Sequence, residues 1–264
     1  MKAFKNKVIW ITGASSGIGA ELAQQLDRLG AKLILSARNK SALEELNQKL
    51  SNAEHHMVLP LDLADSKDFT LLTNQVVERY SKIDYLFNSG GISQRAEAGE
   101  TSLEIDRKIM EVNYFGNIAL TKAVLPIFQE QKSGHIVVTS SIAGKFGFFL
   151  RSAYAASKHA LHGFYESLML EEEKNNIYVT LVCPGKINTP ISVNALTADG
   201  SKHGKVDRNQ ADGMPVETCV QQMLKATQDQ KREVLIGNKE IKAVTLKRLF
   251  PSLFWKVIKK QKAT

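Results

Sequence analysis

Short apolar runs alternate with helical patterns along most of the chain, and this alternation limits its fold more than any other feature. The strand-like runs cover 7–12, 32–36, 56–59, 84–88, 135–140, 177–183 and 233–236. Helical periodicity covers 18–29, 40–50, 66–80, 102–131, 152–175 and 215–229. Such strands, each followed by a helix, are typical of a parallel sheet buried on both faces. We predict a single α/β domain with a doubly wound parallel sheet, which binds ligands beyond the carboxyl ends of its strands.

The turn after the first strand is rich in glycine. It reads Gly13-Ala-Ser-Ser-Gly17-Ile-Gly19 and leads into a helix with Leu22 and Leu26 on one face. Glycines let the backbone approach a pyrophosphate, and the N–H groups of a helix N-terminus bind it. The spacing is Gly-x3-Gly-x-Gly, and any tight turn between a strand and a helix could use glycines. In this context the turn predicts a dinucleotide site in a Rossmann fold.

A second motif can move a proton. Tyr154 and Lys158 are four residues apart, and Ser141 precedes the tyrosine by thirteen residues. Positions i and i+4 share one face of a helix, so the lysine cation can lie beneath the phenol ring. A nearby cation should lower the pKa of the phenol from its ordinary value of ~10. Ser141 would hold a substrate oxygen. Taken alone, the pair equally fits an amphipathic helix with one solvated lysine.

With these motifs the chain resembles the classical short-chain dehydrogenase/reductase family over residues 5–237. The resemblance implies a catalytic tetrad of Asn113, Ser141, Tyr154 and Lys158. It also implies cofactor contacts from Gly13, Ser15, Ser16, Gly17, Ile18, Gly19, Asp62, Leu63, Asn88, Gly91, Tyr154, Lys158, Pro184, Gly185, Ile187 and Thr189. One motif departs from the family, because Asn88-Ser-Gly-Gly91 stands where Asn-Asn-Ala-Gly is usual. The run 192–200 resembles an orphan, membrane-associated subgroup.

The same resemblance implies a role for each member of the tetrad. Tyr154 exchanges a proton with the substrate oxygen, and Ser141 fixes that oxygen. Lys158 lowers the pKa of the tyrosine and holds the nicotinamide ribose, while Asn113 orders a water. Hydride then passes between the nicotinamide ring and the carbonyl carbon of a small-molecule substrate.

The choice of cofactor depends on the residues after the second strand. Enzymes that use NAD place an acid here to bind the ribose hydroxyls, whereas this chain has Ala37 followed by Arg38. A guanidinium can pair with the 2′-phosphate that an acid would repel. Arg38 could instead be a solvated loop residue. We predict that the chain prefers NADP(H) and that Arg38 is a cofactor contact.

Two other functions compete with this interpretation. The segment Gly13-Ala-Ser15-Ser-Gly17 also reads Gly-x-Ser-x-Gly, the nucleophile elbow of serine hydrolases. That alternative leaves Tyr154 and Lys158 without a role. The other alternative is a non-catalytic protein that binds NADP, and the intact tetrad argues against it.

The substrate side is less constrained. Phe146, Phe148, Phe149 and Leu150 either line an apolar pocket or pack at a subunit contact. The irregular segment 186–214 is interpreted as a substrate lid, with disorder as the alternative. His159 and His162 share a helix without obvious acidic or cysteine partners, so we predict no metal. The helices at 102–131 and 152–175 are the expected contacts of a homo-oligomer.

The end of the chain differs in charge from the rest. Residues 239–264 hold eight Lys/Arg and one acid, a net of +7 out of +8 for the whole chain. The catalytic part, 1–238, is therefore nearly neutral, which argues against nucleic-acid binding. Pro251 is expected to begin a final helix. Apolar residues alternate with the cations, and this suits either an anionic membrane surface or docking on protein. They are Leu249, Phe250, Leu253, Phe254, Trp255, Val257 and Ile258.

A few features of the sequence bear on where in the cell the protein is located. It has two cysteines, no apolar run long enough to span a bilayer, and no apolar core of a signal peptide near its start. We expect a cytoplasmic protein with reduced thiols. The substrate, the direction of the reaction and its stereochemistry do not follow from these motifs.

Overall fold

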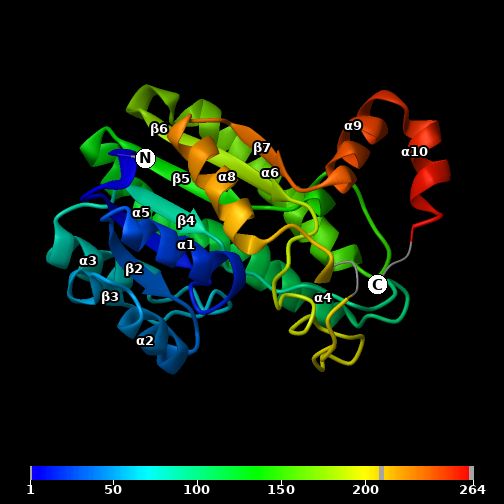
Figure 1. Ribbon diagram of the computed structural model, residues 1–264, viewed down its shortest axis with the longest axis horizontal. Helices are drawn as coiled ribbons and strands as arrows, with labels where there is room; N and C mark the ends of the chain where they lie inside the picture. The colour runs from blue at the N-terminus through cyan, green and yellow to red at the C-terminus, as the bar shows by residue number, and fades with distance from the viewer. Residues whose placement is uncertain (1, 208–210, 262–264) are drawn as a thin grey trace.

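The computed structural model describes residues 2–207 and 211–261. One sheet of seven parallel strands crosses the molecule in the order β3-β2-β1-β4-β5-β6-β7 (Figure 1). Its strands are β1 Val8–Thr12, β2 Lys32–Ser36, β3 Met57–Val58, β4 Tyr85–Asn88, β5 Gly134–Thr139, β6 Ile177–Pro184 and β7 Glu233–Ile236. The chain order reverses direction between β1 and β4. Ligands bind at such switch points in doubly wound sheets, so the predicted fold class is confirmed.

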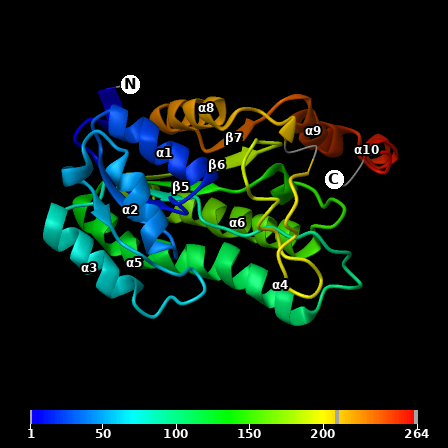
Figure 2. The ribbon, with the colours of Figure 1, turned by 60° about the horizontal axis from the view of Figure 1, so that its bottom comes forward.

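Helices cover both faces of the sheet. Their bounds are α1 Gly17–Arg28, α2 Lys40–Gln48, α3 Phe69–Tyr80, α4 Leu103–Met110, α5 Gly116–Gln131, α6 Ser152–Glu171, α8 Val216–Gln228, α9 Lys242–Leu249 and α10 Pro251–Ile258. Figure 2 shows α1 and α8 on one side of the sheet and α5 and α6 on the other.

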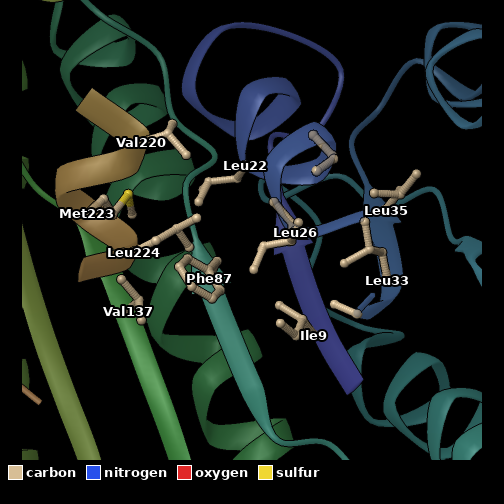
Figure 3. Packing of buried hydrophobic residues seen from close by; sticks show 14 of the residues in the cluster. Ile9, Leu22, Leu26, Leu33, Leu35, Phe87, Val137, Val220, Met223 and Leu224 are labelled. Carbon is tan, nitrogen blue, oxygen red and sulfur yellow. The ribbon is translucent and has the colours of Figure 1, made fainter. Parts of the chain in front are cut away.

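Alternation along each strand builds the two layers of the core. All five residues of β1 are buried. Ile9 points toward the layer that α1 and α8 complete with Leu22 and Val220 (Figure 3). Trp10 belongs to the opposite layer, beneath α3, α5 and α6. Because both faces are buried, the strands read as continuous apolar runs in the sequence.

The predicted helix at 102–131 is interrupted. The structure has α4, then a π-helical stretch at Glu111–Phe115, then α5. A π-helical stretch inserts one extra residue per turn, which periodicity does not reveal, and such stretches recur at functional sites. Here it carries Asn113.

Two segments lie beyond the carboxyl ends of the strands. The described part of the expected lid, 186–207 and 211–214, is irregular and bridges Leu196 to Gln94. The predicted lid residues 208–210 lie outside the described residues. Helices α9 and α10 form an antiparallel hairpin at one end of the molecule (Figure 1). Pro251 begins α10 as predicted, whereas α9 was not predicted. Across the described chain, no helix is both long and apolar enough to cross a bilayer.

Candidate active site

A cavity of about 1890 Å³ opens beyond the carboxyl ends of the strands. Ligand sites commonly have volumes of about 300–1,000 Å³, so this one has room for a dinucleotide and a second molecule. Its wall contains every predicted cofactor residue except Asn88. It also contains Ser141, together with Tyr154 and Lys158.

The glycine turn forms one end of the cavity. Gly13 has a φ of +67°, and a Cβ there would lie 2.8 Å from the Cα of Gly90. A Cβ on Gly19 would lie 2.2 Å from the carbonyl oxygen of Gly13. Helix α1 starts here, and its N-cap residue Ser16 makes no side-chain capping hydrogen bond. The first N–H groups of α1 are therefore available to an anionic ligand, as a pyrophosphate requires.

Tyr154 and Lys158 lie on α6 and meet as predicted. The Lys158 Nζ is 5.8 Å from the centroid of the Tyr154 ring and donates a 2.8 Å hydrogen bond to the Thr139 carbonyl oxygen. Burial lowers the pKa of Lys158 to about 8. It also raises the pKa of Tyr154, against the opposing effects of a hydrogen bond with Ser141 and of the Arg95 and Arg151 charges. This direction is opposite to the predicted one because burial outweighs the neighbouring charges.

Ser141 reaches the phenol from the end of β5. Its Oγ accepts a 3.1 Å hydrogen bond from the Ala143 N–H and is 3.4 Å from the Pro184 carbonyl oxygen. The side chain therefore caps the short 3-10 helix at Ile142–Gly144. This cap fixes the serine hydroxyl beside Tyr154.

Asn113 lies behind the cavity wall. Its Oδ1 accepts a 2.8 Å hydrogen bond from the Ile92 N–H, and its Nδ2 donates to the Ile92 carbonyl oxygen at 2.9 Å and to the Ser157 Oγ at 3.0 Å. A Cβ built on Gly91 would lie 3.0 Å from the Asn113 Oδ1 and 3.6 Å from the Lys158 Nζ. The amide and the lysine therefore both lie close to the point where a Gly91 side chain would begin.

Asn88 does not reach the cavity. Its side chain is fully buried and donates to the Thr121 Oγ1 at 2.9 Å and to the Tyr165 hydroxyl at 3.1 Å. These bonds join β4 to α5 and α6. Asn88 is therefore the one predicted cofactor residue that does not line the cavity, and its side chain packs in the core.

Residues 88–91, which differ from the usual Asn-Asn-Ala-Gly motif, form hydrogen bonds and close contacts with neighbouring segments. The Ser89 and Gly90 N–H groups donate to the Thr12 Oγ1 at 3.1 and 3.0 Å. A Cβ on Gly90 would lie 2.6 Å from the Leu63 Cδ1. Glycine thus lets this turn pack closely against the segment that carries Asp62.

The aromatic cluster divides between the cavity and solvent. Phe146 and Phe148 line the cavity, whereas Phe149 is exposed. Sequence analysis did not identify Arg95 or Arg151, which also line the cavity. The one feature of the sequence that could have indicated them is that they lie within a few residues of Gly91 and Tyr154.

His162 has an acidic partner on its own helix, Glu166, whose Oε1 is 3.6 Å from the His162 Nδ1, and further partners from the sheet. Its Nε2 is 3.7 Å from the Cys183 Sγ, and its Nδ1 is 3.6 Å from a Glu233 carboxylate oxygen. The expectation that it lacks acidic and cysteine partners is therefore wrong. Lys145 forms an ion pair with the same carboxylate, and burial lowers the pKa of His162 to about 4.

Comparison with known proteins agrees with this geometry. The family described as short chain dehydrogenase matches residues 7–200. A mouse protein, dehydrogenase/reductase SDR family member 7B, is 43% identical over 260 residues, which cover 96% of this chain and 80% of the relative. A Drosophila melanogaster relative, dehydrogenase/reductase SDR family protein 7-like, is 41% identical over 97% of this chain and 80% of its own length.

Solved structures share the fold. A Burkholderia phymatum short chain dehydrogenase/reductase in complex with NAD has a TM-score of 0.84 at 24% identity, covering 96% of each chain. A short-chain dehydrogenase from Streptomyces avermitilis has a TM-score of 0.82 at 28% identity, covering 97% of this chain and 96% of the other. Since the family match covers most of the chain and close relatives match nearly all of it, the protein belongs to the short-chain dehydrogenase family.

Proposed function

We propose that the protein is an NADP(H)-dependent oxidoreductase that interconverts a carbonyl and an alcohol on a substrate with apolar character. One observation carries the proposal: Ser141, Tyr154 and Lys158 line the same cavity as a glycine turn that would receive a pyrophosphate. No histidine is among the described residues of the cavity wall, so the serine-hydrolase alternative lacks its usual base.

The side chains divide the work of a proton transfer. The Ser141 hydroxyl would hold the substrate oxygen, and Tyr154 would donate a proton to it during reduction or accept one during oxidation. Lys158 and Asn113, which both lie close to Gly91, would hold the ribose and relay the proton. The nicotinamide cofactor, when bound, supplies or accepts the hydride.

A substrate screen tests the reaction class. Ketones, aldehydes, steroids and retinoids would be offered with NADPH or NADH, and the absorbance of the reduced nicotinamide would be followed. Turnover of any carbonyl compound excludes a non-catalytic binding protein. Labelling of the protein by a serine-reactive phosphonate, without cofactor binding, would favour the hydrolase.

The preference for NADP(H) is assigned to Arg38, which lines the cavity beside Ala37. We expect Arg38→Ala to weaken NADPH binding about tenfold or more, because a hydrogen bond to a charged group contributes about 1.5–3 kcal/mol. NADH, which lacks the 2′-phosphate, should change less than about twofold by the same reasoning. Fluorescence titration with each cofactor measures both.

Lys40→Ala is the matched control, because Lys40 is an exposed neighbour that pairs with Glu44. Equal loss of NADPH binding in both variants would indicate a general charge effect. Unchanged NADPH binding in Arg38→Ala would leave Arg38 as a solvated loop residue.

The carboxyl-terminal hairpin has two faces, and each fits one of the two sequence-based interpretations. Phe254 and Ile258 are buried, and the Phe254 ring centroid lies 5.3 Å from that of Phe146. The outer face consists of Leu249, Phe250, Leu253, Trp255 and Val257, which are 41–60% exposed. Exposed cations, Arg248, Lys256, Lys259 and Lys260, lie on the same hairpin.

We infer that this outer face contacts an anionic membrane surface from the cytoplasm. Cations beside apolar side chains suit the boundary between headgroups and acyl chains. Phe250 and Val257 also line the cavity, so an apolar substrate could enter from that side.

Tryptophan fluorescence can test the membrane contact. The chain has two tryptophans, and Trp10 is fully buried while Trp255 is half exposed. We expect anionic vesicles to shift the emission to the blue at low salt, and high salt to reverse the shift. Leu253→Glu should weaken binding, whereas Leu71→Glu, an exposed control on α3, should not. Equal effects of the two substitutions, or no shift in the intact protein, would contradict the contact.

We also infer a homo-oligomer through α5 and α6. Phe115, the last residue of the π-helical stretch before α5, is 48% exposed although it packs against the Tyr114 ring. Sedimentation equilibrium measures the assembly state directly.

A further inference from the structure

Two arginines that sequence analysis did not identify share one carboxylate inside the cavity wall. The Arg95 Nε and Nη2 lie 2.8 and 2.6 Å from the Asp207 Oδ2, and the Arg151 Nη2 lies 3.1 Å from the same oxygen. The Arg95 and Asp207 side chains are 3% and 1% exposed. Taking these charges from water is costly, so the cluster needs a reason beyond stability.

Among the described residues, both arginines contact the same oxygen of the Asp207 carboxylate, Oδ2. Its Oδ1 has no hydrogen bond from the described residues, and the His203 Nε2 is 3.5 Å away. Arg151, by contrast, also donates to the Phe149 carbonyl oxygen at 2.9 Å. An incompletely satisfied carboxylate costs less to displace than one with all its hydrogen bonds.

The arginines are near the reacting end of the cavity. Both arginines are residues of the cavity wall, as is Tyr154, and both guanidinium charges act on the pKa of its phenol. Arg95 is fixed by its backbone, whose N–H donates a 2.8 Å hydrogen bond to the Leu196 carbonyl oxygen. The Phe148 ring lies 5.5 Å from the Arg151 guanidinium carbon. A substrate beside Tyr154 would thus meet two cations and an aromatic ring together.

The net charge of the cavity wall also favours an anionic ligand. Among the described residues it has nine cations, Arg38, Arg95, Lys108, Arg151, Lys158, Lys186, Lys202, Lys239 and Lys242. It has two acids, Asp62 and Glu240. A dinucleotide would account for Arg38 and Lys158, at the positions described above. Seven cations remain, and Arg95 and Arg151 are the two whose charges act on Tyr154.

We propose that Arg95 and Arg151 bind a carboxylate or phosphate group of the substrate, and that Asp207 holds their place until it arrives. This deepens the proposed function: the substrate would be a carbonyl compound with an anionic group and an apolar portion. Arginine matches the planar or tetrahedral oxygens of such groups with paired hydrogen bonds. The apolar portion would lie against Phe146 and Phe148.

Calorimetry with compounds that cannot react tests the site apart from catalysis. Octanoate, octyl phosphate and octanol would be titrated into the full-length protein saturated with NADP⁺, so that the phosphate sites of the cofactor are filled. We expect at least one anion to bind at least tenfold more tightly than octanol. The two anionic probes distinguish a carboxylate site from a phosphate site. Equal affinities for all three compounds would overturn the proposal.

Substitutions then locate the anion. Arg95→Met should remove the preference for the anion. Arg95→Lys keeps the positive charge but loses the paired N–H donors of the guanidinium, so it should keep part of the preference. Arg232→Met is the control, since Arg232 is exposed and its Nη2 is 3.7 Å from a Glu173 carboxylate oxygen. A preference that survives Arg95→Met, or is lost equally in Arg232→Met, would overturn the assignment. NADPH fluorescence and melting temperature check that each variant is folded.

Asp207→Asn tests whether the substrate anion displaces Asp207 from the arginines or whether Asp207 forms a permanent structural ion pair with them. Removing the competing charge should tighten binding of the preferred anion several-fold without tightening binding of octanol. Weaker anion binding in this variant would overturn the exchange and leave Asp207 as a structural anchor of the lid. Because these titrations need no turnover, failure of the substrate screen and failure of this inference are separate results.

Discussion

Replacing Tyr154 with phenylalanine should reduce turnover by a factor of about 100 to 10,000, the usual range for loss of a general acid or base. The phenol is the group that shares a hydrogen bond with Ser141, and phenylalanine keeps the ring while removing the exchangeable proton. Binding of the cofactor should persist, because the glycine turn and Arg38 are unchanged. Initial rates with the best substrate of the screen, together with NADPH fluorescence, measure the two effects separately.

The pH dependence should reflect the raised pKa of the phenol. Burial keeps Tyr154 protonated at neutral pH, so reduction starts with its proton in place. The value of kcat/KM for reduction should stay level through neutrality and fall only at alkaline pH. There Lys158, with a pKa of about 8, loses its proton before the tyrosine does.

Tyr178→Phe is the control for this experiment, because Tyr178 is an exposed tyrosine on β6. It should keep normal rates. If Tyr154→Phe also keeps near-normal activity, Tyr154 is not the acid, and the proposed mechanism is wrong.

Gly116→Ala should destabilise the protein and weaken cofactor binding together. A Cβ at this position would lie 1.9 Å from the Leu63 carbonyl oxygen, which is backbone and cannot rotate away. Overpacking of this kind costs about 1–3 kcal/mol, and more where the backbone must move. Leu63 lines the cavity, and Gly116 directly follows the π-helical stretch that carries Asn113. The displacement would therefore reach both the cofactor wall and the tetrad.

Gly163→Ala is the matched control in another helix. Apart from its chain neighbours and the adjacent backbone of α6, no atom of the described residues lies within 4 Å of its Cβ position. It should raise the free energy of unfolding by up to about 1 kcal/mol, because alanine favours a helix more than glycine does. Urea denaturation of both variants, with NADPH titration, gives the comparison. Equal stability changes for the two glycines would show that helix propensity, and not the contact with Leu63, controls the result.

Contacts between residues that are far apart in the sequence explain why the prediction from sequence was incomplete. The Arg95–Asp207 pair joins positions 112 residues apart, and the Arg151–Asp207 pair joins positions 56 apart. His162 meets Cys183 of β6 and Glu233 of β7. No local pattern encodes these neighbours. Asn88 belongs to a cofactor motif, yet its side chain turns toward Thr121 and Tyr165 because the helices behind β4 offer hydrogen-bonding partners.

The sequence by itself determined the strand order along the chain, most of the helices, the glycine turn, and the approach of Lys158 to Tyr154, because each depends on residues within one turn or one strand. Only the tertiary structure decided the sign of the pKa shift of Tyr154, the division of the α9–α10 hairpin into a buried and an exposed face, and the pair of arginines in the cavity. Burial and charge pairing depend on which distant segments the fold brings together, and a periodic pattern does not contain that information.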